Sequence, residues 1–165
     1  MKKQINFILL AVMAVFSYTF VSCGNDDDEP SENQIEINGT KYSVSLNYIM
    51  GTWIEVYEGV GVTTLHMNIP MGGVYGTYSF TGEASHEPKI GDDLSSMKDF
   101  EVGRDFFVVN RDEMADYTYS SGSAKVISTD KANSLITIQF SNLKMVYDGN
   151  SFVFNGTVKM PFMYQ

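Results

Sequence analysis

Apolar side chains recur at every second position along most of the chain after Gln34. Ile136, Ile138 and Phe140 show this alternation in the C-terminal third, as do the apolar residues of the segment 65–69. A period of two is that of a β-strand with one buried face. We find no segment with the 3.6-residue period of an amphipathic helix. The pattern therefore predicts an all-β domain.

Turn signals separate the alternating runs at short intervals. Asn38-Gly39 and Asp148-Gly149 each lie between two such runs, and these dipeptides favour the tight turns of β-hairpins. Pro70 is expected to end a strand, and Asn155-Gly156 to separate the last two strands. With turns every 8 to 12 residues or so, we expect about nine or ten antiparallel strands built from successive hairpins.

A sheet of this length must curl or double over to bury its apolar face. The fold expected is therefore an antiparallel β-sandwich or a curled, closed barrel. The segment Arg104–Asn110 is apolar on both faces, which favours the sandwich, with this strand lying deep between the layers. Gly82–Lys98 is expected to be a long loop with a short helical turn near Asp93–Lys98.

The first 22 residues have a different character. A basic start at Lys2 and Lys3 precedes a mostly apolar run over residues 5–21, which is typical of a secretory signal peptide. This run is too short and too interrupted for a good membrane-spanning helix, which needs about 20 apolar residues. The chain's only cysteine, Cys23, follows directly, and an acidic run comes next: Asp26, Asp27, Asp28 and Glu29.

This N-terminal region resembles the precursor of a bacterial lipoprotein, with Phe20-Val21-Ser22-Cys23 in the place of the lipobox. The acidic run is similar to that of Bacteroidetes lipoproteins carried to the outer surface of the outer membrane. The resemblance implies a signal peptide over residues 1–22, a lipidated Cys23 with a flexible tether over residues 23–33, and one all-β domain over residues 34–165. Two or more acyl chains make stable anchoring.

The remaining domain also loosely resembles the small all-β domains of Bacteroidetes lipoproteins of unknown function. This likeness lies in the segments GTYSFTG and SLITIQFSNLKM, and in FNGTVKMPF close to the C-terminus. Their short strand-turn pattern is not specific. The likeness implies no chemistry.

Charge and cysteine content exclude some classes of function. The chain has 11 basic and 20 acidic residues; without Lys2 and Lys3, 9 basic against 20 acidic residues leave a net charge of about −11. Such a surface disfavours nucleic acid, which needs clustered Lys and Arg. With Cys23 lipidated, no thiol remains for a disulfide or a cysteine metal site. Packing must therefore supply the stability, and we expect no cofactor.

Catalytic motifs such as G-x-S-x-G, H-E-x-x-H and G-x-x-x-x-G-K-[ST] are absent from the sequence. His66 lies mid-strand opposite the apolar face, where we expect a solvated or hydrogen-bonded histidine. His86 lies in a loop with Asp92-Asp93, which leaves open a small cell-surface hydrolase. The same aspartates suit Ca²⁺ ligation with Glu87 or Asp99, although a solvated acidic loop is the ordinary expectation.

Two aromatic pairs are candidates for ligand stacking. Trp53 and Tyr57 share a strand face, as do Tyr117 and Tyr119. Flat rings beside polar groups can stack on sugars, although strand aromatics more often pack within the sheet. We therefore expect a non-enzymatic binding or structural module for a glycan, a peptide or a surface protein, with the hydrolase as the alternative.

Overall fold

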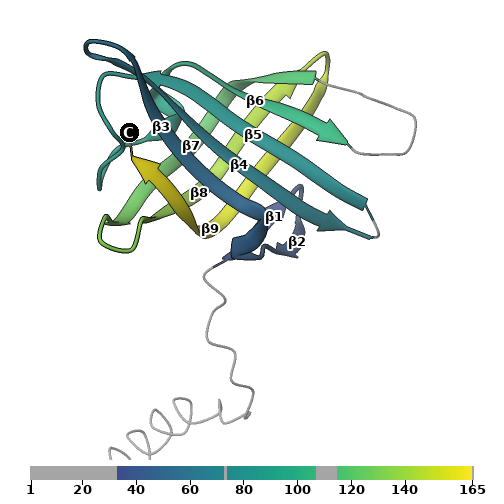
Figure 1. The fold of residues 1–165 in the computed structure, drawn as a ribbon. Coiled ribbons are helices and arrows are strands. Elements are labelled where there is room, and N and C mark those ends of the chain that lie inside the picture. The colour runs from purple at the N-terminus through teal and green to yellow at the C-terminus, as the bar shows by residue number, and fades with distance from the viewer. Residues whose placement is uncertain (1–32, 73, 107–114, 165) are drawn as a thin grey trace, which may run out of the picture. The chain divides into compact units, whose positions relative to one another are not determined.

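The computed structural model describes residues 33–72, 74–106 and 115–164 (Figure 1). Residues Ser31–Gln165 form one compact unit. Cys23 and the acidic residues 26–29 lie outside the described residues. The lipid anchor and the surface-export signal therefore stay predictions.

The described residues form nine strands and two short 3₁₀-helices. In chain order they are β1 (Asn33–Ile37), β2 (Thr40–Ser43), η1 (Leu46–Tyr48), β3 (Ile49–Tyr57), β4 (Val60–Met71), β5 (Val74–Ala84), η2 (Leu94–Ser96), β6 (Lys98–Phe106), β7 (Ala115–Asp130), β8 (Leu135–Tyr147) and β9 (Asn150–Tyr164). The expected helical turn near Asp93–Lys98 is confirmed as η2.

Seven strands close into a barrel. From β3 to β9 each strand pairs antiparallel with the next, and β9 then closes the ring by pairing with β3 in parallel, Gly51 opposite Phe162. The β1–β2 hairpin lies outside this ring of seven, where β1 pairs with the earlier part of β9 along the same edge that β3 uses later. Figure 1 shows β3, β4 and β5 side by side on the near wall.

The expected all-β fold of about nine strands is confirmed, but the preference for a sandwich is wrong. The sheet closes because β9 is long enough to pair with β8 on one edge and with both β1 and β3 on the other. Arg104 is half-buried rather than deep, and its guanidinium lies over the Phe152 ring at 4.1 Å. Residues 107–110 of the supposed central strand lie outside the described residues.

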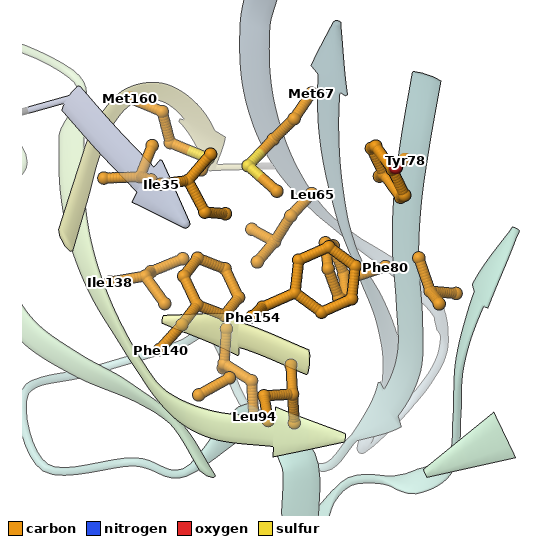
Figure 2. Packing of buried hydrophobic residues seen from close by; sticks show 14 of the residues in the cluster. Ile35, Leu65, Met67, Tyr78, Phe80, Leu94, Ile138, Phe140, Phe154 and Met160 are labelled. Carbon is orange, nitrogen blue, oxygen red and sulfur yellow. The ribbon is translucent and has the colours of Figure 1, made fainter. Parts of the chain in front are cut away.

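The barrel interior is filled by the inward-facing side chains of its strands. Figure 2 shows the rings of Phe80, Phe140 and Phe154 pointing toward one another among aliphatic side chains. Phe80 and Phe154 meet edge to face, with their centroids 5.1 Å apart, an arrangement that aromatic quadrupoles favour. Ile136 and Ile138, assigned to the buried face from their period, are fully buried. A barrel of this size is just wide enough for side chains to fill it.

Two expected strand boundaries are wrong. β4 continues through Pro70, which pairs with Tyr75 of β5. On the other side β3 begins at Ile49, opposite Met67, so no described residue of β3 lies opposite Pro70, and proline needs no donor there. Asn155-Gly156 likewise lies inside β9 rather than between two strands.

Irregular positions in the neighbouring strands β7, β8 and β9 lie next to one another, and they bend all three strands. The β7–β8 register shifts around Gly122, which has a φ of +89°. The β8–β9 register shifts next to Asn142, whose N–H donates to Asn155 Oδ1 at 2.7 Å. Bulges increase twist and bend the strand that carries them. These irregular positions therefore give the sheet the curvature that a small closed barrel requires.

Candidate functional site

The four aromatic residues named from the sequence do not form one surface. Trp53 and Tyr117 belong to the core, with only 7% and 5% of their surface exposed, whereas Tyr57 and Tyr119 are exposed. The Trp53 indole packs over Gly61, where a Cβ atom would come within 2.4 Å of it. Buried rings cannot stack on a ligand from solvent, so Trp53 and Tyr117 act as packing residues.

Tyr119 borders a shallow acidic groove of about 310 Å³, which includes Asp99 and Glu101. Its ring meets Phe100 edge to face with centroids 6.4 Å apart, and its hydroxyl donates to the Gly122 carbonyl at 3.0 Å. These contacts fix the ring at the groove wall. Tyr119 therefore remains a candidate for contact with a ligand. Tyr117, which the sequence analysis paired with it, is buried and does not take part.

His66 is a hydrogen-bonded sheet histidine, as expected. It is half-buried on the outer face of β4, and a hydrogen bond of 2.9 Å joins its Nδ1 to Ser79 Oγ on β5. The two residues are direct cross-strand partners. This pair forms part of the outer wall of the barrel.

His86 lies in the loop between β5 and η2, beside a hollow of about 240 Å³. Its Nδ1 is 3.6 Å from Asp92 Oδ2 and 2.8 Å from the Glu87 carbonyl oxygen. Asp92 Oδ2 also accepts a hydrogen bond from the Lys89 N–H at 3.0 Å. The imidazole thus meets one carboxylate rather than two, and about half of it is exposed to solvent.

Asp93 also lines this hollow, and its carboxylate anchors the loop. Its Oδ1 accepts from the Ser95 N–H at 3.1 Å, from the Ser95 hydroxyl at 2.7 Å and from the Ala124 N–H of β7 at 3.0 Å. The next residue, Leu94, is buried in the core (Figure 2). The described residues contain no group of three or more His, Cys, Asp or Glu side chains suited to a metal ion.

Replacing Asp93 by alanine should lower the free energy of unfolding by about 1 to 3 kcal/mol, because three donors lose their acceptor and the Ala124 N–H is buried. Asparagine keeps a carbonyl oxygen at this position, so Asp93→Asn should cost less. Urea denaturation of the two variants measures the difference. Equal losses would mean that Oδ1 does not anchor the loop through these bonds.

A third aromatic pair, Tyr48 and Tyr75, was not predicted from the sequence. Tyr48 ends η1, and Tyr75 lies near the start of β5. Their ring centroids are 5.5 Å apart with the planes tilted by 46°, and 46% and 43% of their surfaces are exposed. The Ser45 hydroxyl, which accepts the Asn47 N–H at 3.4 Å, caps η1 and so helps to orient Tyr48.

Asn68 and Thr77 complete this site, and we call the four residues the tyrosine hollow. It has a volume of about 270 Å³. The buried Thr77 hydroxyl donates to Asn68 Oδ1 at 2.6 Å, and the Asn68 Nδ2 group makes no hydrogen bond to the residues that the structure describes. The Tyr48 side chain raises the pKa of Tyr75 above its ordinary value, first through hydrogen bonding and then through charge. Tyr75 thus stays uncharged at neutral pH.

Comparison with protein-family models, with curated proteins and with solved structures finds no match for this chain. Within the described ranges, no helix is long and apolar enough to cross a lipid bilayer. We therefore infer function from the side chains that the structure brings together.

Proposed function

We propose that this chain is a lipid-anchored protein of the outer-membrane surface that binds carbohydrate without chemical conversion. The signal-like leader, Cys23 and the acidic run support the placement. The observation that carries the binding function is the tyrosine hollow, which two half-exposed rings line together with an amide and a hydroxyl.

The hollow matches the two-sided chemistry of a sugar ring. One face of a pyranose presents C–H groups, which pack on aromatic rings, while its edge presents hydroxyls, which need hydrogen-bond partners. Tyrosine offers a large flat contact area at low cost in conformational entropy. The Asn68 amide can donate to a sugar hydroxyl. The lining is uncharged and the chain is strongly acidic, so neutral sugars fit better than acidic ones.

Substitution of either tyrosine should weaken binding. The buried core residues of the described part of the chain all belong to the compact unit Ser31–Gln165. This fragment is therefore the protein to use, with neutral glycan arrays for screening and calorimetry for affinity. We expect Tyr48→Ala and Tyr75→Ala each to reduce affinity about tenfold or more, a loss of about 1.4 kcal/mol. Tyr57→Ala is the matched control, because Tyr57 is also exposed but lies outside the hollow.

Two results would contradict the proposal. Unchanged glycan binding by the Tyr48→Ala, Tyr75→Ala double variant would remove the hollow from the function. An unmodified Cys23 thiol, found by mass spectrometry of the protein from its host membrane, would remove the anchor. The glycan-binding site and the lipid anchor are tested separately, so either part of the proposal can fail without the other.

The hydrolase alternative has less support. His86 and Asp92 provide a possible base and its orienting carboxylate at 3.6 Å. Asp93, the other aspartate of this loop, is instead engaged by Ser95 and Ala124. Glycoside hydrolysis needs two carboxyl groups across one cleft, and this loop offers His86 only one.

A further inference from the structure

A row of polar side chains that contains no Asp, Glu, Lys or Arg leads away from the tyrosine hollow along the outer face of β4 and β5. The row consists of three cross-strand pairs: Asn68 with Thr77, His66 with Ser79, and Thr64 with Thr81. We call these six residues the polar track. The near wall of the barrel in Figure 1 includes both strands.

The polar track is held in place by its own hydrogen bonds. The Thr77 hydroxyl donates to Asn68 Oδ1 at 2.6 Å, and a bond of 2.9 Å joins His66 Nδ1 to Ser79 Oγ. All six side chains are partly or fully buried. Short side chains that are fixed before binding lose little conformational entropy when a ligand covers them.

The strands on the two sides of the polar track carry side chains of different size opposite its middle pair. On β3 the exposed Met50 lies opposite His66. On β6 the residue opposite Ser79 is Gly103, which has no side chain. Gly103 lies between the inward-facing Val102 and Arg104, so it belongs to the outer face. The track is therefore open toward β6 at its middle pair.

The backbone does not require glycine at position 103. Gly103 is not among the residues with a positive φ, and a Cβ atom there would have its nearest contacts at 3.6 Å from Asp116 Oδ1 and 3.9 Å from the Ser79 carbonyl oxygen. These are ordinary van der Waals distances. Glycine weakens a strand, and inside one it often marks a bulge, a bend, or a place where a ligand or another backbone comes close. The β5–β6 register does not shift at Gly103.

We propose that the ligand is a linear, neutral polysaccharide that extends from the tyrosine hollow along the polar track and passes beside Gly103. This inference rests on the proposed function and specifies its substrate class. The tyrosine rings hold one end of the bound stretch by stacking. Sugar hydroxyls farther along hydrogen-bond to the imidazole and hydroxyl groups of the track. Affinity therefore rises with chain length until the track is covered.

The test uses Ser31–Gln165 and neutral oligosaccharides of glucose, xylose and mannose, each from monosaccharide to hexasaccharide, measured by calorimetry. The affinity of the wild-type fragment should increase about tenfold or more from disaccharide to hexasaccharide. Gly103→Thr places a branched side chain beside the track and should lower hexasaccharide affinity to about that of the disaccharide. Disaccharide binding at the hollow should not change. Gln139→Thr introduces the same residue at an exposed position of β8 and should leave both affinities unchanged.

Ser79→Ala provides a second variant that does not enlarge any side chain. It removes a hydroxyl of the track and should weaken hexasaccharide binding several-fold while disaccharide binding persists. Equal affinity for disaccharide and hexasaccharide would overturn the extended track but leave the tyrosine hollow as a binding site. Full hexasaccharide binding by Gly103→Thr and Ser79→Ala would overturn it as well. If the wild-type fragment binds none of these oligosaccharides, the proposed function is refuted, and this inference with it.

Discussion

Replacement of Gly122 by alanine is expected to lower the free energy of unfolding by about 3 to 5 kcal/mol. Two effects add at this position. The φ of +89° lies in a region that L side chains rarely adopt, and a Cβ atom would lie 2.1 Å from the Asn142 carbonyl oxygen. Because that oxygen belongs to the backbone of β8, the two strands must move apart. Urea denaturation of the Ser31–Gln165 fragment measures the loss.

Gly149→Ala is the matched control for this prediction. Gly149 has a similar φ of +76°, but no atom lies within 4 Å of the place its Cβ would take. The substitution therefore introduces the backbone strain alone and should cost about 1 kcal/mol. Equal losses in the two variants would mean that β7 and β8 separate easily at the bulge, and that the close approach does not hold the barrel closed.

The bulge at Gly122 also shows how far the sequence predicts this fold. Strands and hairpins follow from local signals, such as the period of Ile136, Ile138 and Phe140, which are all buried, and the Asp148-Gly149 turn between β8 and β9. The bulge at Ser121-Gly122 does not follow from such signals, because it depends on the close approach of the neighbouring strand β8, which no local pattern contains.

The candidate site was predicted less well than the fold. Period two predicted Trp53 and Tyr57 on one strand face, but the register between β3 and β4 shifts between Glu55 and Tyr57. Tyr57 therefore pairs with Val60 on the opposite face, and it is exposed while Trp53 is buried. Ile49 and Gly51 precede Trp53 on the same face and are buried, which is the local signal for an inward position. Tyr48 and Tyr75 come from elements that are not strand partners, so only the tertiary structure brings them together.

Replacement of Phe154 by alanine should cost about 3 to 5 kcal/mol of unfolding free energy. The ring is fully buried and lies edge to face against both Tyr78 and Phe80, with centroid separations of 5.3 Å and 5.1 Å. Alanine would leave a cavity among side chains that cannot all move into it. Phe154→Leu retains most of the volume and should cost less than half as much. Chemical denaturation of both variants gives the comparison.

This substitution also tests whether the binding face depends on the core beneath it. Tyr78 and Phe80 alternate along β5 with Thr77, Ser79 and Thr81 of the polar track, so the same strand carries core contacts on one face and the proposed ligand contacts on the other. We expect Phe154→Ala to weaken hexasaccharide binding even where the variant is fully folded, because β5 loses inward support. Phe154→Leu should bind as the wild type does. Full affinity in a destabilised but folded Phe154→Ala variant would show that the track keeps its geometry without the aromatic core behind it.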